Sequence, residues 1–258
     1  MGLAILDSAG PPVARFADQP PGDLAAMTSL PHLPQRQSII ATCLAMNQTG
    51  INQGASGNLS VRVEDGFLIT PSSLPYDEME PADVVEMGFD GTYLGARRPS
   101  SEWRFHRDIL KARPDVDVVL HAHSTFATAL AVHGRGIPSF HYMVALAGGD
   151  SIRCAPYATF GTQELSDNAV AALEGRLACL LANHGMIVLG KTVKAALALA
   201  VEVETLARQY LYAHQLGEPV ILPPDEIARV AEKMRLMKYG QSPEPDAAPE
   251  DTARPRQA

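Results

Sequence analysis

Two apolar segments of this chain, residues 115–120 and 177–183, each run directly into histidine. Both are rich in aliphatic or β-branched residues, which is typical of buried strands. The first segment continues as His-Ala-His, and because successive side chains of a strand alternate between faces, His121 and His123 project together from one strand end. His184 follows the second segment. Both segments therefore end at the position where a parallel or mixed sheet usually carries its site.

A carboxylate in a third segment, Glu102 in Ser-Ser-Glu-Trp, completes a candidate ligand set. Three imidazoles and a carboxylate suit Zn²⁺, which prefers imidazole nitrogen and accepts a carboxylate that can leave to open a coordination position. A single His-x-His or His-Gly is often incidental, but two strands of the same construction support each other. The sequence predicts one Zn²⁺ per subunit, bound by Glu102, His121, His123 and His184.

Length and charge restrict the class of protein. With 258 residues, of which 46% are hydrophobic and 19% charged, the chain is long enough for one large globular domain. A formal net charge of −8 argues against a nucleic-acid partner, because neutralising phosphates requires clustered Lys and Arg. The sequence has neither a long apolar span nor a basic region followed by an apolar core at its start, so we expect no membrane segment, no signal peptide and a cytoplasmic location. Cys43, Cys154 and Cys179 show no metal-ligand spacing and are expected to be reduced thiols.

Composition divides the chain into three parts. Residues 1–34 are rich in Pro, Gly and Ala and are expected to form an N-terminal arm. Residues 241–258 are rich in Pro and Ala and are expected to be a disordered tail. Between them, residues 35–240 contain no linker or repeat and predict a single domain.

Helical and strand patterns alternate within the predicted domain. Helical spacing occurs in residues 35–49, 101–112, 125–134, 162–174, 191–216 and 224–237. Ser100 or Ser101 is expected to cap the second of these helices. Two hairpins are expected, one turning at Asp65-Gly66 and one at Asp90-Gly91. Hairpins mixed with helices predict an α/β fold of three layers, with a mixed, largely antiparallel central sheet flanked by helices.

Three turns of small residues are candidates for holding an anion: Ser56-Gly57-Asn58, Thr70-Pro71-Ser72-Ser73 and Ser100-Ser101. Backbone N–H groups and hydroxyls bind phosphate without much positive charge. Each turn alone is also explained by the backbone preferences of Ser and Gly, and the last by helix capping. Because Ser100 and Ser101 adjoin Glu102, the arrangement favours a phosphorylated hydroxy-carbonyl substrate on which the cation acts as a Lewis acid.

Several longer segments of the chain form a recognisable series, namely GNLSVR, DGFLITPSSLPYDEM, PSSEWRFH, HAHS, IPSFHYMVALAGGDSIRCAPYATFGT, NHG and MKYG. Together they resemble the class II aldolase/adducin family, in particular its L-fuculose-1-phosphate aldolases. They match in order and leave out only the arm and the tail. One departure is that Ser72-Ser73 stand where the fuculose enzymes have Thr-Gly, which adds a Cβ where the backbone approached phosphate most freely.

The resemblance implies roles for particular residues. It implies Zn²⁺ on the same three histidines and, in the resting enzyme, on Glu102. It makes Tyr142 a proton donor to the site of a neighbouring subunit, Tyr239 a second tyrosine at the site and Phe160 an aromatic wall, in a C4 homotetramer with sites between subunits. The phosphate pocket it implies consists of Gly57, Asn58, Ser72, Ser73, Ser100 and Ser101.

The activity implied is reversible cleavage of a ketose 1-phosphate, of the L-fuculose-1-phosphate type, to dihydroxyacetone phosphate and an aldehyde such as lactaldehyde. Glu102 would move the proton at the dihydroxyacetone phosphate carbon, and Tyr142 would serve the aldehyde oxygen. Arg104 and His106 are interpreted as structural helix residues.

Four alternatives remain open on the same fold. They are a 5-deoxyribulose or 5-methylthioribulose 1-phosphate aldolase, a pentulose-5-phosphate 4-epimerase, a methylthioribulose-1-phosphate dehydratase, and a non-catalytic adducin-like binding module. The epimerases tend to carry Asp where this chain has Glu102, which favours an aldolase. An adducin-like module would lack the histidines, and all three are present.

Overall fold

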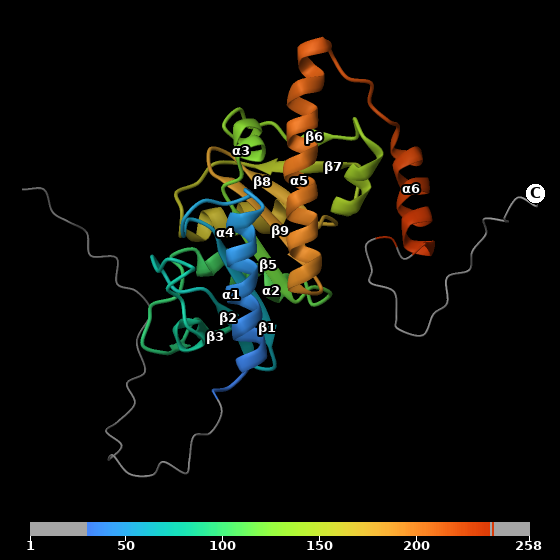
Figure 1. Cartoon of the computed structure of the whole chain (residues 1–258). Coiled ribbons are helices and arrows are strands. Elements are labelled where there is room, and N and C mark those ends of the chain that lie inside the picture. Colours follow the sequence, from blue (N-terminus) through green and yellow to red (C-terminus); the bar gives the residue numbers. More distant parts are fainter. Residues whose placement is uncertain (1–29, 238, 240–258) are drawn as a thin grey trace, which may run out of the picture.

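A computed structural model describes residues 30–237 and 239, and in this part of the chain one mixed sheet is covered by helices on both faces (Figure 1). The strands are β1 (Asn58–Val63), β2 (Gly66–Ile69), β3 (Val85–Gly88), β4 (Tyr93–Leu94), β5 (Val118–Ala122), β6 (Ile137–Pro138), β7 (Ser151–Ala155), β8 (Ala178–Leu181) and β9 (Gly185–Gly190). Their order in the sheet is β4-β3-β2-β1-β5-β9-β8-β7-β6, and among these pairs only β7 and β8 are parallel. The predicted three-layer α/β fold is confirmed.

All six predicted helices are present in the described residues. They are α1 (Leu33–Gln48), α2 (Trp103–Ala112), α3 (Thr125–Ala131), α4 (Gln163–Ala172), α5 (Val193–Ala213) and α6 (Pro224–Leu236), and the short 3₁₀ helices are η1 (Pro81–Asp83), η2 (Tyr142–Ala147) and η3 (His214–Leu216). Helix α1 begins at Leu33, inside the predicted arm. Residues 1–29 of that arm and the predicted tail (residues 241–258) lie outside the described residues.

One local prediction is wrong and another holds only in part. Val63 pairs with Gly66, so the first hairpin turns at Glu64-Asp65, and Gly66 lies in β2, where a Cβ would lie 2.0 Å from the carbonyl oxygen of Met87. The N-cap residue of α2 is Glu102, whose side chain makes no capping bond, but the hydroxyl of Ser100 accepts a hydrogen bond from the backbone N–H of Glu102 at 3.3 Å. Pro99 bridges to Pro71, which holds the segment before α2 in an extended conformation.

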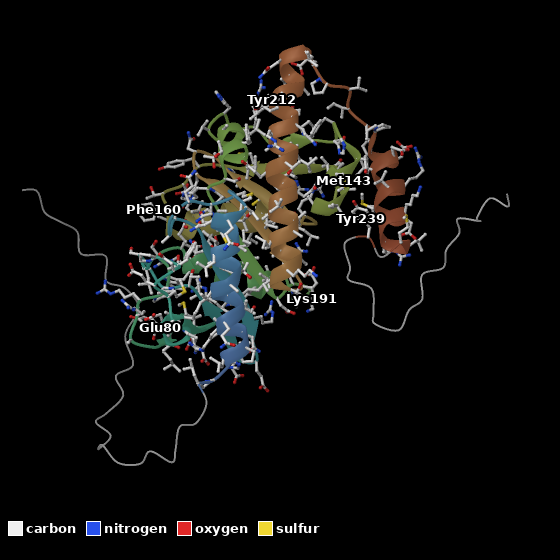
Figure 2. All side chains as sticks on the ribbon, viewed as in Figure 1. Glu80, Met143, Phe160, Lys191, Tyr212 and Tyr239 are labelled. Carbon is white, nitrogen blue, oxygen red and sulfur yellow. The ribbon has the colours of Figure 1, made fainter. Side chains whose placement is uncertain are left out.

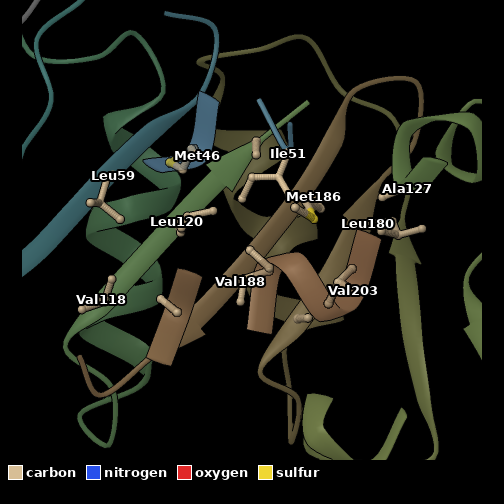
Figure 3. Close-up of a cluster of buried hydrophobic side chains, with 14 of the residues drawn as sticks. Met46, Ile51, Leu59, Val118, Leu120, Ala127, Leu180, Met186, Val188 and Val203 are labelled. Carbon is tan, nitrogen blue, oxygen red and sulfur yellow. The ribbon is translucent and has the colours of Figure 1, made fainter. Parts of the chain in front are cut away.

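Alternating side chains of the central strands build two hydrophobic cores. Along β5, Val118 and Leu120 face α1, α3 and α5, whereas Val119 faces α2 and α4. Figure 3 shows the first core, in which Leu120 and Met186 of the sheet lie near Met46 of α1. This period of two is what a strand buried on both faces requires. His121 therefore faces the α2 side, with its ring 5.5 Å from that of Phe105.

Strand direction determines where the site lies. Strands β5 and β8 are each antiparallel to β9, which lies between them, so β5 and β8 run in the same direction and end at the same edge of the sheet. Strand β1 is antiparallel to β5, and its first residue, Asn58, is paired with His121. Three segments that are distant in the sequence thus meet at one place.

The two outermost strands of the sheet are short. The outer strands β4 and β6 contain two residues each, and β6 includes Pro138. A proline has no backbone N–H to donate to a further strand.

Two other expectations concern the thiols and the membrane. Cys43, Cys154 and Cys179 are free thiols, as expected, and burial raises the pKa of Cys43. Within residues 30–237 and 239, no helix combines the length and the apolar character needed to cross a bilayer.

Candidate metal centre

Three imidazoles converge at this edge of the sheet. The ring centroids of His121, His123 and His184 are 4.8, 4.8 and 4.9 Å apart, an almost equilateral arrangement. Each offers one ring nitrogen within 4.8 Å of the other two. His184 reaches the cluster because it lies in the tight turn between β8 and β9, next to Asn183, whose φ is +56°.

Hydrogen bonding prepares His121 to bind a metal ion. Its Nδ1 lies 2.9 Å from the carbonyl oxygen of Met186, which can only accept, so Nδ1 carries the proton. The lone pair on Nε2 then points toward His123 Nε2, 2.9 Å away. Burial lowers the pKa of His121 to about 3 and that of His184 to about 4. Neutral imidazoles oriented by a backbone carbonyl are the form that binds metal.

Glu102 adds a carboxylate to the cluster. It is buried, and its Oε2 lies 3.3 Å from His121 Nε2 while its Oε1 lies 3.3 Å from His184 Nε2. Oε2 accepts a hydrogen bond from Asn58 Nδ2 at 2.9 Å, but Oε1 accepts none in the described part of the chain. A buried carboxylate oxygen facing neutral imidazoles lacks electrostatic compensation. A divalent cation would supply it, so the four predicted ligands fit a metal ion.

The glycine after His184 is required by close packing. A Cβ on Gly185 would lie 2.5 Å from the carbonyl oxygen of Ala122 and 2.9 Å from Cδ2 of His123. We therefore expect Gly185→Ala to lower the free energy of unfolding by about 1–3 kcal/mol, as overpacking does, and to weaken metal binding by displacing His123. Urea denaturation and chelator competition would measure the two effects.

The other end of β9 offers a matched control. A Cβ on Gly190 would lie 2.7 Å from the backbone nitrogen of Ala196, away from the histidines. Gly190→Ala should therefore destabilise the fold and leave metal affinity unchanged. Equal metal affinities in the two variants would contradict the role of Gly185 at the site.

Two of the predicted phosphate turns lie side by side. The backbone N–H of Ser100 donates to Thr70 O, and that of Ser72 donates to Arg98 O, both at 3.0 Å. Thr70 is also bonded to Leu59, next to Asn58, through its backbone N–H and its hydroxyl. The turns at 56–58, 70–73 and 100–101 thus meet beside Glu102.

Individual residues of these turns differ in their surroundings. Ser73 has a φ of +60°, the left-handed region that favours glycine, so the serine at this position carries backbone strain. A Cβ on Gly57 would lie 2.6 Å from His121 O, which explains why glycine is needed there. The hydroxyl of Tyr76, a residue missed by the sequence analysis, donates to Gly57 O at 2.5 Å. The Asn58 side chain is buried against Glu102.

The three aromatic residues named from the resemblance lie in two separate places. Phe160 is 64% exposed and precedes Gly161, where a Cβ would lie 2.8 Å from Ser101 O. Tyr142 and Tyr239 are 48% and 50% exposed. Figure 2 shows Tyr239, and Met143 next to Tyr142, on the other side of α5 from Phe160. A single chain therefore brings Phe160, but neither tyrosine, to the phosphate turns.

His106 was interpreted from the sequence as a structural helix residue, and the structure places it next to the site. Its ring nitrogens lie 2.7 Å from Ser60 Oγ and 2.5 Å from Asn58 Oδ1. In the sequence, the only indication that His106 lies near the site is that it follows Glu102 by four positions, a spacing that puts both residues on the same side of a helix start. Arg104 is structural as expected, because its guanidinium donates to Gly161 O at 2.7 Å.

Comparison with known proteins agrees with this geometry. Residues 37–211 match the family described as Class II Aldolase and Adducin N-terminal domain. The chain is 55% identical over 215 residues to a 5-methylthioribulose-1-phosphate/5-deoxyribulose-1-phosphate aldolase of Rhodospirillum rubrum, a match covering 82% of this chain and 96% of that protein. It is 47% identical over 205 residues to an L-fuculose phosphate aldolase of Escherichia coli K12, covering 79% and 94%. A solved L-fuculose 1-phosphate aldolase superposes with a TM-score of 0.76 at 41% identity, covering 78% of this chain and 95% of that one.

The fold and the histidine cluster define an enzyme of the metal-dependent aldehyde-lyase class. The chain belongs to the class II aldolase and adducin family. The resemblance seen in the sequence is confirmed. A non-catalytic adducin-like module is not supported, because these relatives are named as aldolases and the three histidines lie together.

Proposed function

We propose that the protein cleaves a ketose 1-phosphate reversibly to dihydroxyacetone phosphate and an aldehyde, with Zn²⁺ as its cation. The observation that carries the proposal is the convergence of three neutral imidazoles and Glu102 beside the serine-rich turns. A cation held by this set would act as a Lewis acid toward the carbonyl and hydroxyl oxygens of the sugar. Imidazole nitrogen favours Zn²⁺ among the common divalent cations.

The chain's own groups would move the protons. Cleavage of the bond between C3 and C4 leaves an electron pair on the three-carbon fragment and requires loss of the proton from the C4 hydroxyl. We assign delivery and removal of the C3 proton to Glu102, whose Oε1 accepts no hydrogen bond in the described residues. We assign the proton on the aldehyde oxygen to Tyr142 of a neighbouring subunit.

The turns at 56–58, 70–73 and 100–101 would bind the 1-phosphate through the hydroxyls of Ser72, Ser73, Ser100 and Ser101. Backbone N–H groups of these turns would add to the binding, except those of Ser72 and Ser100, which donate to Arg98 O and Thr70 O. These turns adjoin Glu102, so an anion there would lie within one small substrate of the cation. A phosphorylated substrate is consistent with the names of the relatives.

A homotetramer with C4 symmetry is part of the proposal. Tyr142 and Tyr239 are exposed, Tyr239 and Met143 (the residue after Tyr142) lie on the other side of α5 from Phe160 (Figure 2), and α6 packs against η2. This placement supports the tyrosines completing a site on a neighbouring subunit. A cytoplasmic location stays a prediction.

Two sugar classes are candidates. L-Fuculose 1-phosphate would release lactaldehyde, whereas 5-deoxyribulose or 5-methylthioribulose 1-phosphate would release acetaldehyde or a methylthio aldehyde. The second class is favoured by 55% identity to the Rhodospirillum rubrum enzyme, against 47% to the fuculose enzyme of Escherichia coli.

Condensation reactions with a set of aldehydes would test both the proposed reaction and the preference for the side group of the aldehyde. The zinc-loaded enzyme would receive dihydroxyacetone phosphate with lactaldehyde, acetaldehyde, glycolaldehyde or methylthioacetaldehyde. We expect acetaldehyde and methylthioacetaldehyde to react about 10-fold faster than glycolaldehyde, because a pocket for an apolar tail leaves the hydroxyl of glycolaldehyde without a hydrogen-bond partner, which costs about 1–3 kcal/mol. Preference for lactaldehyde would favour the fuculose type. No condensation with any aldehyde, together with epimerisation or water loss from a pentulose phosphate, would contradict the aldolase proposal.

A further inference from the structure

A continuous line of buried hydrogen bonds runs behind Glu102. Ser60 Oγ lies 2.7 Å from His106 Nδ1, and His106 Nε2 lies 2.5 Å from Asn58 Oδ1. Asn58 Nδ2 donates to Glu102 Oε2 at 2.9 Å. All four residues are buried, so the line is closed to solvent at each link.

The chemistry of the groups determines which atom donates and which accepts in each of these hydrogen bonds. The carboxylate of Glu102 only accepts, so the amide nitrogen of Asn58 must face it and Oδ1 must face His106. Because Oδ1 also only accepts, the proton of His106 must be on Nε2. Nδ1 of the neutral ring then accepts from the hydroxyl of Ser60. With the proton on Nδ1 instead, two lone pairs would face each other across 2.5 Å.

The surroundings keep the ring of His106 neutral and in place. Phe105 stacks against it with ring centroids 4.6 Å apart and an interplanar angle of 27°. Burial, followed by the nearby ring of His121, lowers the pKa of His106 well below its ordinary value. Glu102 and His106 are four residues apart at the start of α2, so the helix holds both on the same side.

We propose that His106 is a positioning residue for Glu102. Protonated on Nε2, it holds the amide of Asn58 in the orientation that anchors Oε2 of Glu102 and leaves Oε1 as the oxygen that exchanges protons. The inference rests on the proposed role of Glu102 and deepens it. The two carboxylate oxygens of Glu102 therefore differ. Oε2 accepts a hydrogen bond from Asn58, which His106 and Ser60 hold in place, whereas Oε1 accepts no hydrogen bond in the described residues.

A purely structural role would give different results from a positioning role. A buried histidine that only filled space could be replaced by an apolar side chain of similar volume, at the cost of leaving Asn58 Oδ1 unpaired. Such a change would lower stability without a specific effect on metal affinity or turnover. A positioning residue, by contrast, should be rescued by any side chain that restores the N–H donor toward Asn58.

The test compares His106→Gln with His106→Met in the zinc-loaded full chain. The two side chains have similar length, but only glutamine offers an amide N–H in place of Nε2–H. Altered partners of a metal-binding residue typically cost about 10–100-fold. We expect losses of that size in kcat and in Zn²⁺ affinity of the apoenzyme for His106→Met, with KM little changed, and near-wild-type values of both for His106→Gln.

Zn²⁺ affinity, measured by chelator competition, separates failure of the inference from failure of the proposed function. If wild type cleaves no ketose phosphate, the proposed function fails, while the affinity difference still tests His106. Equal affinities and equal kcat values in the two variants would overturn the positioning role.

One measurement does not depend on the folding of any variant. In wild-type protein labelled with ¹⁵N at histidine, His106 should be protonated on Nε2. Observation of the proton on Nδ1 would overturn the inference.

Ser60→Ala removes the hydroxyl that donates to Nδ1 of His106. We therefore expect this variant to populate the tautomer with the proton on Nδ1 and to have a lower kcat, as His106→Met does.

Discussion

Replacing Glu102 by glutamine is expected to lower turnover by about 10²–10⁴-fold, the range typical of a positioned general acid or base. Glutamine has nearly the same shape, and its side-chain oxygen can still accept from Asn58 Nδ2. It cannot take up a proton at neutral pH. The three histidines are unchanged, so with Zn²⁺ in excess most of the metal sites should remain filled, although the metal affinity falls. Steady-state cleavage rates and metal content by emission spectroscopy would measure both quantities.

Glu64→Gln provides the control for loss of one negative charge. Glu64 is exposed in the turn between β1 and β2, away from the sheet edge that carries the histidines. Its replacement should leave turnover unchanged. If the Glu102→Gln variant cleaves substrate at a near-normal rate, Glu102 is not the proton-transfer group and the assigned mechanism fails.

His123→Ala is expected to abolish tight metal binding and to reduce activity to about 1% or less of wild type. The side chain of His123 lies just past the end of β5 and is accessible to solvent, so its truncation should leave the apo fold intact. At a Zn²⁺ concentration of about 1,000 times the wild-type Kd, metal binding raises the free energy of unfolding of wild type by about 4.1 kcal/mol. For a variant that binds about 100-fold more weakly, the increase is about 1.4 kcal/mol. Unfolding with and without Zn²⁺ would measure this difference.

His133→Ala is the matched histidine control, because His133 is exposed in the loop after α3. It should show the full zinc-dependent stabilisation of wild type. An undiminished gain in the His123→Ala variant would show that zinc binds elsewhere, and the proposed ligand set would be wrong.

The strand pattern around the histidines allowed much of this geometry to be predicted. Alternation along β5 correctly placed His121 and His123 on one side. Strand β9, by contrast, was missed, although its central run Met186–Leu189 is apolar, because a short apolar run does not reveal its partners. That strand explains how His184 meets the other two, since it makes β5 and β8 run in the same direction.

Side-chain partners at the site could not be predicted from spacing. The amide of Asn58 was expected in a phosphate pocket, and it is bonded to Glu102 and lies next to His106. Both contacts join β1 to α2 across more than forty residues, and no local pattern records such a pair. Periodicity could not predict either that Tyr239 and Met143, which follows Tyr142 in η2, lie on the other side of α5 from Phe160 (Figure 2).

The short outer strands restrict how copies of this protein can associate. An exposed strand with free N–H and C=O groups can recruit a strand from another molecule and continue the sheet. Here β4 and β6 offer two residues each, and Pro138 lacks an N–H to donate. In the part of the chain described, the outer strands therefore offer few backbone N–H and C=O groups for pairing with another molecule. Contacts that these described residues make between copies must therefore come from side chains of helices and loops, whose complementarity a few substitutions can remove without disturbing the sheet.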